Sequence, residues 1–334
     1  MVDTVKVANF KTTVTDSVGI IYLPPSFAVV EAVAFKHKVQ TFFAEYPEVK
    51  EIILDFESTH FIDSSGIGAL VICYRLSQTN SAQVRLRNVP PQVMMALSMT
   101  ELDKVLDIEQ ASELSEAEQR SQGRISLENL PATHPSVRSR AKRLLDIVGA
   151  LVGLMITGVL FVPIAIAIKK DGGPIFFKQT RCSWMGKRFT IWKFRSMVLD
   201  AEKLKAQIDN EVEGPLFKNE NDPRITKIGR FLRKTSLDEL PQFWNVLRGE
   251  MSLVGTRPPT PDEIEQYEVP EWRRLNVKPG MTGEWQVNGR SSVKKFEDVI
   301  RLDLKYQEYW SLRYDIKLIL KTIFIVFSKK SGAS

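Results

Sequence analysis

Cysteine and histidine are scarce in this chain of 334 residues. It has two cysteines, Cys73 and Cys182, and three histidines, His37, His60 and His134. They are scattered along the chain and do not show the close spacing of zinc ligands. We therefore expect neither disulfides nor a zinc site, and so few cysteines favour a reducing, cytosolic environment.

The chain also lacks a signal peptide in its first twenty residues, and positive charge is scarce in its first part. Residues 1–130 hold 11 Lys and Arg against 17 Asp and Glu, a net charge of −6. Residues 131–334 hold 35 against 23, a net charge of +12. This asymmetry predicts two modules with different partners, the basic one binding a nucleic acid, a nucleotide or a phospholipid surface.

Residues 1–108 predict a small α/β domain with a mixed or parallel sheet, because strand and helix patterns alternate along them. Residues 109–136 are rich in Ser, Glu and Gln, which is typical of a flexible linker. Strands are expected within 18–24, 51–56 and 83–89, and helices within 29–47, 66–81 and 90–106.

An apolar run from Leu144 to Ile168 carries a single charge, Asp146. As one helix it reaches roughly 37 Å, enough to cross a hydrocarbon core of about 30 Å. Both flanks are basic, so the charge pattern gives no crossing direction, and Pro163 removes one backbone donor. A re-entrant helix that returns to the same membrane face fits better than a single-span anchor, which stays the alternative.

The chain after Gly172 is of soluble type. It predicts a hairpin around Met185 and Gly186 and an amphipathic helix over 196–212. The segment 314–330 has an apolar face with lysines at its margin, typical of an interfacial membrane helix or of a core helix.

Arginines, a few carboxylates and Gly/Pro turns recur in the basic module. They lie in "KFRSM" (193–197), in "NDPRITKIGRFLRKTSLDELPQFWNVLRGEMSLVGTRP" (221–258), in "KPGMTGEWQVNGRS" (278–291) and in "RLDLKY" (301–306). Arginine binds phosphate through paired hydrogen bonds. A carboxylate among cations keeps its charge, and can act as a nucleophile or hold Mg²⁺.

With these motifs in this order, residues 142–327 resemble the bacterial sugar transferases, the monotopic polyprenyl-phosphate phosphoglycosyl transferases. The resemblance implies transfer of a sugar 1-phosphate from a nucleotide diphosphate sugar, expected to be a UDP-hexose, to polyprenyl phosphate such as undecaprenyl phosphate. It implies Asp238 as the covalent nucleophile and Glu239 as the Mg²⁺ ligand. The product would start the synthesis of an exopolysaccharide or an O-antigen type glycan. The implied substrate-binding residues are Lys193, Arg195, Arg233, Arg257, Arg290 and Asp303.

The sequence departs from the family pattern at two places. The family's helix-breaking Ser-Pro is replaced by Gly158 and Val159, so the break falls at Gly158 or at Pro163. The family's Pro-Arg-Pro is Thr256-Arg257-Pro258 here, which keeps the arginine but changes the turn.

The first domain resembles the STAS domain of sulfate transporters and anti-sigma factor antagonists over about residues 3–108. The resemblance rests on "LDFESTHFIDSSGIGAL". It implies Ser64, after Asp63, as a regulatory phosphosite for a partner kinase. The alternative is that Ser64 caps and packs a helix.

The fold class expected is therefore α/β. A STAS-like mixed sheet with helices (1–108) and a linker (109–136) precede a membrane-associated α+β transferase domain (137–334) with a re-entrant helix (144–168) and interfacial helices. The expected place is the cytoplasmic face of the bacterial inner membrane, with a protein partner or kinase on the first domain and a homo-oligomer as an option. A membrane-anchored signalling adaptor with an inactive transferase-like half is the alternative. A nucleic-acid binder is disfavoured by the apolar run.

Overall fold

The computed structural model describes residues 10–109, 133–170, 172–204, 207–217, 219, 221–288 and 295–327. The chain divides into two compact units. The first contains Met1–Thr133, Met185–Lys187 and Tyr267–Asn276, and the second contains His134–Trp184, Arg188–Gln266 and Val277–Ser334. Most of the predicted linker lies outside the described residues, so its boundaries and flexibility stay predictions.

The first unit is built on a mixed sheet, as the sequence predicts. Its strand order is β1-β2-β4-β6-β7, in which β1 and β2 are antiparallel and the other neighbours are parallel. A short parallel pair, β3 with β5, lies outside this sheet. The strands are β1 (Thr12–Thr15), β2 (Val18–Tyr22), β3 (Ser26–Phe27), β4 (Glu51–Asp55), β5 (Phe61–Ile62), β6 (Gln83–Arg87) and β7 (Asp107–Ile108).

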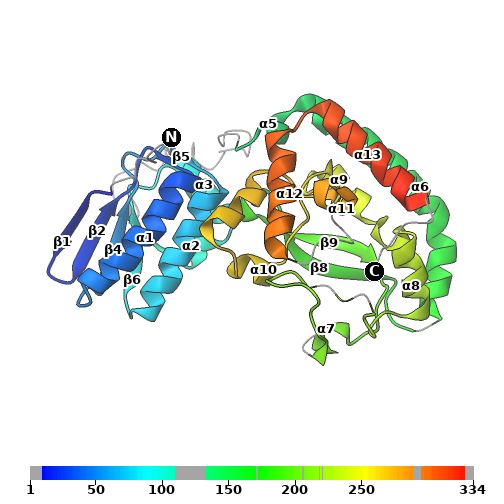
Figure 1. Cartoon of the computed structure of the whole chain (residues 1–334), viewed down its shortest axis with the longest axis horizontal. Coiled ribbons are helices and arrows are strands. Elements are labelled where there is room, and N and C mark those ends of the chain that lie inside the picture. Colours follow the sequence, from blue (N-terminus) through cyan, green and yellow to red (C-terminus); the bar gives the residue numbers. More distant parts are fainter. Residues whose placement is uncertain are drawn as a thin grey trace, which may run out of the picture. The chain divides into compact units, whose positions relative to one another are not determined.

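Helices cover this sheet, and Figure 1 shows α1 and α2 side by side in front of it. Phe35, Val39 and Phe42 recur at helical spacing on α1 and are fully buried, as are Ile52 and Leu54 of β4. The helices predicted within 29–47 and 66–81 are confirmed, with α1 ending two residues before Pro47, whereas the helix predicted within 90–106 ends at Met99 and is followed by a separate turn after left-handed Glu101 (φ 62°). The helical segments are α1 (Val29–Glu45), α2 (Ser64–Thr79), α3 (Pro91–Met99), η1 (Leu102–Lys104) and η6 (Val269–Asn276).

The second unit combines a hairpin, a short parallel strand pair and many helices. The hairpin of β8 (Phe176–Cys182) and β9 (Arg188–Phe194) is confirmed, and positive φ angles at Met185 and Gly186 (58° and 82°) make the chain reversal. The strands β10 (Ser252–Val254) and β11 (Gly280–Thr282) are parallel. The helical segments are α5 (Pro135–Arg138), α6 (Arg140–Lys169), α7 (Ala201–Leu204), α8 (Lys227–Lys234), η5 (Leu237–Glu239), α9 (Gln242–Arg248), α10 (Pro261–Glu265), α11 (Glu284–Asn288), α12 (Phe296–Glu308) and α13 (Leu312–Phe327). The short turn η3 (Trp184–Gly186) lies where the chain passes from the second unit to the first.

The apolar run lies in α6, which continues through both Gly158 and Pro163. Figure 1 shows that α6 bends along its course, and its end approaches α8. By length and composition it is the helix of the described residues that could cross a membrane, and only 22% of its apolar window is buried inside the protein. Exposed apolar side chains such as Met155 (70% exposed) and Val159 (75%) therefore need a covering that the described protein does not provide.

Glycines bring α6 against its own unit. A Cβ atom at Gly149 would lie 2.5 Å from Leu253 Cδ1, and one at Gly153 would lie 2.4 Å from the ring of Phe243. Asp146, the one charge of the run, is buried and accepts hydrogen bonds from Ser252 Oγ and the Leu253 amide at 2.8 and 2.9 Å. One face of α6 is thus an internal packing surface.

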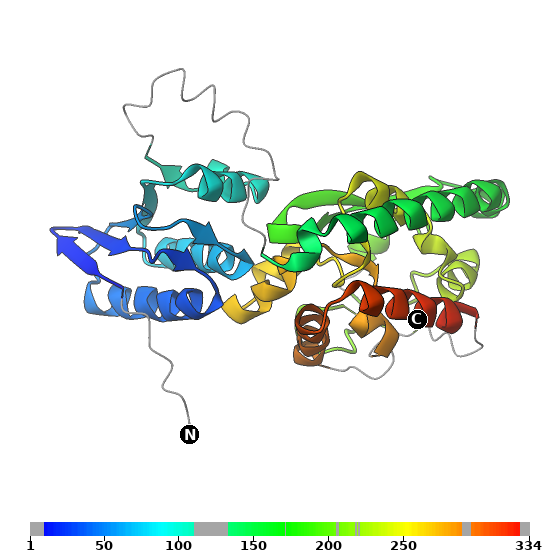
Figure 2. The same ribbon diagram turned by 90° about the horizontal axis from the view of Figure 1, so that it is seen from above.

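Helix α13 has a second apolar exposed face. Figures 1 and 2 show it running in a direction similar to that of α6. Its exposed residues include Ile316, Leu320, Ile323 and Phe324, in the segment predicted to be interfacial. Because these side chains are exposed, the core-helix alternative does not account for this face.

The helix predicted over 196–212 is wrong for most of its length. Among the described residues of this segment, Ala201–Leu204 form a short α-helix, and the residues from 208 to 212 are not helical. Met197 instead forms a bridge with Ile225, and the Val198 amide donates to the Arg224 carbonyl at 2.9 Å. Main-chain pairing with a distant segment, which amphipathic periodicity does not reveal, has replaced the local helix.

Candidate functional site

The adjacent carboxylates lie on one short turn of the second unit. Ser236 adopts a left-handed conformation (φ 55°) after α8, and the turn η5 then carries Asp238 and Glu239 before Pro241 precedes α9. Leu237 and Leu240 pack into an apolar cluster that includes residues of α6. The apolar residues thus hold the turn in place, while the carboxylates between them are left for polar contacts.

Cations surround this pair. The Lys193 ammonium donates to Glu239 Oε1 at 3.0 Å. Arg233, one turn earlier, is half-buried; burial lowers its pKa, while the charges of Asp238, Asp222 and Glu239 act to raise it. An arginine stays protonated even so. Asp238 itself is 6% exposed, so the site is a carboxylate pair in a partly buried, cationic setting.

Arg195 is placed differently from its neighbour Lys193. Its guanidinium donates to main-chain carbonyls of Pro174 (2.9 Å), Ile168 (3.1 Å) and Gly172 (2.6 Å). Ile168 is in the last turn of α6, so Arg195 satisfies carbonyls at the end of that helix. The structure therefore gives Arg195 a positioning contact, and its predicted contact with substrate stays a prediction.

Ser196, the next residue, holds Arg233 and α8. Arg233 Nε donates to Ser196 Oγ at 3.0 Å. A Cβ atom at Gly229 would lie 1.8 Å from the Ser196 carbonyl oxygen, so α8 can approach this segment only with glycine there. Through Arg195 and Ser196, the segment "KFRSM" thus contacts both the end of α6 and Arg233, which precedes the carboxylate pair.

Arg257 forms a paired contact with Glu263, through Nη1 at 2.6 Å and Nη2 at 3.0 Å. Arg181 lies next to them, and burial lowers its pKa to about 10. The changed turn around Arg257 follows Gly255, where a Cβ atom would lie 2.2 Å from the Lys278 carbonyl oxygen. "GTRP" and "KPGMTG" are therefore packed backbone to backbone along β10 and β11.

Two further predicted residues are less defined. Asp303 lies on α12 and is 1% exposed. Arg290 lies outside the described residues. The structure brings Lys193, Arg233, Asp238 and Glu239 into one neighbourhood, whereas Arg195 and Arg257 bind other parts of the chain.

The sequence reasoning missed the Asp222–Arg224 pair. Arg224 Nε and Nη2 donate to Asp222 at 2.9 and 2.7 Å. Burial raises the pKa of Asp222, but the hydrogen bonds from Arg224 outweigh it, so the pKa is lowered. Asp222 also acts electrostatically on Arg233. The spacing Asp-Pro-Arg, an acid and a base around a turn residue, was the available signal.

The residues present fit a magnesium ion only in combination with a substrate. Among the described residues, no group of three or more His, Cys, Asp or Glu is placed to hold a metal. Mg²⁺ typically binds one or two carboxylates and takes its other ligands from phosphates and water. Adjacent carboxylates at Asp238 and Glu239 match that donor set, with Glu239 on the more exposed side.

Ser64 lies at the start of α2 in the first unit and is completely buried. The helix is capped by Asp63, whose Oδ1 accepts from the amides of Ser65 and Gly66 at 2.8 and 3.0 Å. Capping of this helix by Ser64 is therefore wrong, while its complete burial agrees with the packing role that was the other half of that alternative. Burial raises the pKa of Asp63, although these hydrogen bonds act to lower it.

The segment Tyr267–Asn276, which belongs to the same unit, covers this helix start. The Ser64 amide donates to Asn276 Oδ1 at 3.0 Å, and Asn276 Nδ2 donates to Asp63 Oδ2 at 3.2 Å. A Cβ atom at Gly68 would lie 2.4 Å from Cγ of Trp272, so the ring can pack on α2 only with glycine at this position. Phosphorylation of Ser64 stays a prediction, with its hydroxyl closed off in this state.

Comparisons with known proteins match two successive parts of the chain to two families. A family model described as bacterial sugar transferase matches residues 137–329, more than half of the chain. A STAS domain model matches residues 9–117. The anti-sigma factor antagonist SpoIIAA is a solved structure with 24% identity and a TM-score of 0.27, covering 34% of this chain and 99% of that one.

Curated relatives match the second part. The galactosyl transferase CpsE of Streptococcus agalactiae is 53% identical over 188 residues, which is 56% of this chain and 42% of that protein. A UDP-glucose:undecaprenyl-phosphate glucose-1-phosphate transferase of Escherichia coli is 43% identical over 57% of this chain and 41% of that protein. This chain thus spans less than half the length of these two relatives.

A shorter relative is matched over most of its length. The exopolysaccharide production protein ExoY of Rhizobium meliloti is 38% identical over 190 residues, which is 55% of this chain and 84% of that protein. With the family model covering residues 137–329, this chain belongs to the bacterial sugar transferase family.

Proposed function

We propose that the protein transfers a sugar 1-phosphate from a nucleotide diphosphate sugar to polyprenyl phosphate, through a covalent phosphosugar ester on Asp238. The donor class is a UDP-hexose, and the acceptor is undecaprenyl phosphate. The product would start the assembly of an exopolysaccharide or an O-antigen type glycan. The names of relatives support these substrates. The Escherichia coli relative is named for transfer of glucose 1-phosphate between UDP-glucose and undecaprenyl phosphate, and a relative from Salmonella typhimurium, 43% identical over 198 residues, is named undecaprenyl-phosphate galactose phosphotransferase.

The carboxylate pair among cations is the observation that carries the proposal. An aspartate beside a bound diphosphate is ionised at neutral pH but is repelled by the phosphate charges. Arg233 is electrostatically coupled to both carboxylates, and Lys193 contacts Glu239. These cations offset the repulsion and stabilise the charge that develops on the leaving group.

In the first half of the reaction, an Asp238 carboxylate oxygen attacks the sugar-bearing phosphorus. The new P–O bond forms as the bond to the oxygen that bridges the two phosphates breaks. That oxygen takes the electron pair, and the nucleoside monophosphate leaves. The Asp238 turn is fixed by the apolar contacts of Leu237 and Leu240, which keeps the nucleophile in one place.

In the second half, a phosphate oxygen of polyprenyl phosphate attacks the same phosphorus. The bond to Asp238 breaks, the carboxylate is restored, and a polyprenyl diphosphate sugar leaves. Glu239 would hold Mg²⁺, which when bound neutralises charge on the diphosphate. Lys193 then keeps Glu239 oriented and adds a cation near the same oxygens.

We propose that the second unit binds the bilayer surface, so that the phosphate of the polyprenyl phosphate acceptor lies near Asp238. Helix α6 and the exposed apolar face of α13 both belong to the second unit and would enter or lie on the bilayer. We propose a re-entrant, monotopic arrangement of α6, with both modules on the cytoplasmic face of the inner membrane. The basic flanks of α6 and its bend support this arrangement.

The first unit is proposed as a docking module for a protein partner. It carries the acidic excess of the chain and matches the STAS domain model. Ser64 is the proposed target of a partner kinase. Self-association is the other interaction open to this module.

Turnover and covalent labelling test the reaction together. The protein, in lipid nanodiscs with undecaprenyl phosphate, is given UDP-glucose or UDP-galactose and Mg²⁺. We expect the Asp238→Asn variant to lose transfer. We also expect intact-mass measurement with donor alone to show a hexose-phosphate adduct on the parent protein and none on this variant. Glu239→Gln is expected to raise the Mg²⁺ concentration needed for half-maximal rate without lowering the melting temperature.

The exposed Asp262 offers a matched control, since Asp262→Asn makes the same change of charge on an exposed helix start. It should keep parental turnover and adduct. An adduct on the Asp238→Asn variant would mean that another residue is the nucleophile. A parent protein that transfers no sugar phosphate from any UDP-hexose, but still binds a partner through its first unit, would favour the signalling adaptor.

A further inference from the structure

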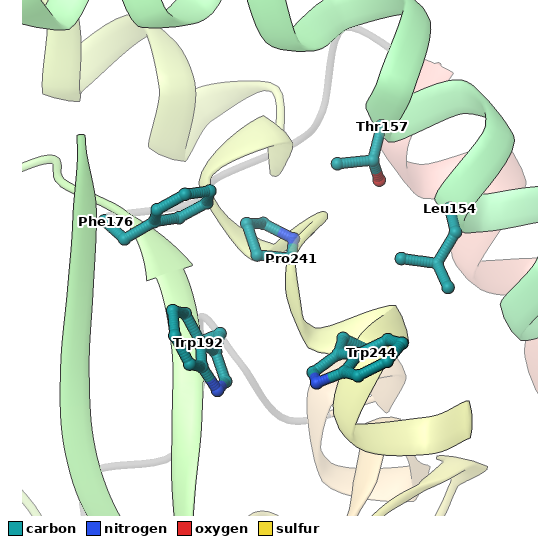
Figure 3. Close-up of a pocket in the computed structure, with 6 residues that line it drawn as sticks. All are labelled: Leu154, Thr157, Phe176, Trp192, Pro241 and Trp244. Carbon is teal, nitrogen blue, oxygen red and sulfur yellow. The ribbon is translucent and has the colours of Figure 1, made fainter. Parts of the chain in front are cut away.

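The second unit holds an apolar cavity of about 280 Å³ close to the carboxylate pair. Figure 3 shows side chains of the β8–β9 hairpin on one side and of α6 on the other, with residues of the turn after the carboxylate pair and of α9 between them. The lining residues are Leu154, Thr157, Phe176, Trp192, Pro241 and Trp244. The cavity therefore lies between the apolar helix α6 and the segment that follows Asp238 and Glu239.

The lining offers little to a polar ligand. Thr157 is the one lining residue with a hydroxyl group, and this hydroxyl already donates to the Gly153 carbonyl at 2.7 Å. None of the other lining groups carries a charge, and their hydrogen-bonding side-chain groups are the indole N–H donors of Trp192 and Trp244, which offer no acceptor. A nucleobase or a sugar needs several hydrogen-bond partners in its pocket, so this chemistry fits a hydrocarbon chain.

The cavity is next to the reacting groups along the chain. Pro241 follows Glu239 by two positions, so their Cα atoms lie within roughly 8 Å of each other. Thr157 Oγ1 of α6 lies 3.4 Å from the Leu240 carbonyl oxygen. A ligand with an apolar chain in this cavity would thus present its first polar group near the carboxylate pair.

A cation lies against the aromatic lining. The Lys178 ammonium lies 4.2 Å from the centroid of the Trp192 ring, on an exposed side chain. Such a cation favours an anionic amphiphile over a neutral one. On the outer side, the neighbouring residue Met155 is 70% exposed and apolar, so a chain that leaves the cavity along α6 meets a surface suited to lipid.

We propose that this cavity binds the isoprene units nearest the phosphate of the polyprenyl phosphate acceptor. The inference rests on the proposed function, because it takes the acceptor class from it. A volume of about 280 Å³ lies just below the range of small-molecule sites, which runs from about 300 to 1,000 Å³. The cavity therefore selects the start of the chain, and the remaining units extend into the bilayer.

Photolabelling tests occupancy without turnover. Farnesyl phosphate with a diazirine on its first isoprene unit is irradiated with the protein in dioleoyl-phosphatidylcholine nanodiscs, and the labelled peptides are mapped by mass spectrometry. We expect labels on peptides that contain the lining residues, with loss of label on adding undecaprenyl phosphate. Equal loss on adding dioleoyl phosphatidic acid would make this a general lipid site, and loss on adding UDP would make it a base site; either result overturns the proposal.

Kinetics give a second readout with a matched control. Leu154→Trp fills the cavity and should raise KM for undecaprenyl phosphate about ten-fold, the loss expected when an apolar group is displaced, while KM for the donor is unchanged. Val105→Trp puts the same group on an exposed apolar position of the first unit and should leave both constants as they are. Trp244→Ala, at a half-exposed position, should raise acceptor KM without a folding defect.

The outcomes separate the two proposals. Labelling of the cavity that undecaprenyl phosphate prevents, in a protein that transfers nothing from any donor, would keep the acceptor site and refute the reaction. Normal transfer with no label in the cavity, and with unchanged acceptor KM in both lining variants, would refute the acceptor site and keep the reaction.

Discussion

Lys142 and Asp315 form a buried ion pair in the second unit, with 2.6 Å between Lys142 Nζ and Asp315 Oδ2 and side-chain exposures of 6% and 0%. Lys142 also donates to the Val254 carbonyl at 3.0 Å, and Tyr306 Oη donates to Asp315 Oδ1 at 2.9 Å. The pair joins the start of α6 to the start of α13. The two helices with exposed apolar faces are thus fixed to each other at one end.

Breaking this pair should strongly destabilise the second unit. We expect Lys142→Ala to lower the free energy of unfolding by about 3–5 kcal/mol, because it leaves Asp315 buried without its partner. Unfolding in mixed detergent micelles measures it. Lys203→Ala removes an ion pair whose side chains are 83% and 68% exposed, and should cost less than about 1 kcal/mol. Equal effects of the two changes would contradict the role given to the buried pair.

Two glycines of α6 should respond in opposite ways to alanine. Gly153→Ala pushes a methyl group into the ring of Phe243, and we expect a loss of about 1–3 kcal/mol in the free energy of unfolding. Nothing lies within 4 Å of a Cβ atom at Gly158, so Gly158→Ala should be neutral or stabilising by up to about 1 kcal/mol. Thermal melting of both variants in the same detergent makes the comparison. A large loss at Gly158 would show that the helix needs flexibility there.

Arg195 should act on stability more than on substrate affinity. Arg195→Lys keeps the charge but cannot reach the carbonyls of Pro174, Ile168 and Gly172 together, so we expect a loss of about 1–3 kcal/mol. Arg230→Lys, at an exposed position on α8, is the control. A parental melting temperature combined with a raised KM for the UDP-sugar would support the substrate contact predicted from the sequence instead.

His134 should make the stability of the second unit depend on pH. Burial lowers its pKa, helped by the charge of Lys142, while the Gln307 carbonyl and Asp315 act to raise it. Its folded pKa is then below the unfolded value of about 6.5. The stabilising contribution is present above that pH and is lost as the pH falls below it, because the unfolded chain takes up the proton first.

Melting temperatures between pH 8 and pH 5.5 check this dependence. We expect the parent protein to lose stability below about pH 6.5, and His134→Gln to lose less over the same interval. A parent curve that is flat over this interval, or one that rises as the pH falls, would mean that burial does not set the protonation of His134.

The periodicity and turn residues of the sequence predicted many of the helices and strands. They could not predict contacts between segments that are far apart in the sequence. The helices of the first unit and the β8–β9 hairpin follow from periodicity and from turn residues such as Gly186. The roles of Asp238 and Glu239 came from the resemblance of their motif to the sugar transferases, and local pattern could not show that Lys193, 46 positions away, contacts Glu239. The sequence could not show that Arg195 caps α6 or that Arg257 binds Glu263. Nor could it show that main-chain pairing of Met197 with Ile225 replaces a helix, since each depends on how separate segments pack.

The complete burial of Ser64 sets an order of events for any kinase that acts on it. A kinase must draw its target serine into its own active site, and Ser64 lies beneath Asn276 and next to Met185 in the first unit. Those residues must therefore leave before the phosphate can be added. The phosphate would be a record that the first unit had already opened, and its charge beside Asp63 would then oppose closure. A phosphorylated Ser64 would therefore mark chains in which the first unit had opened before the kinase acted.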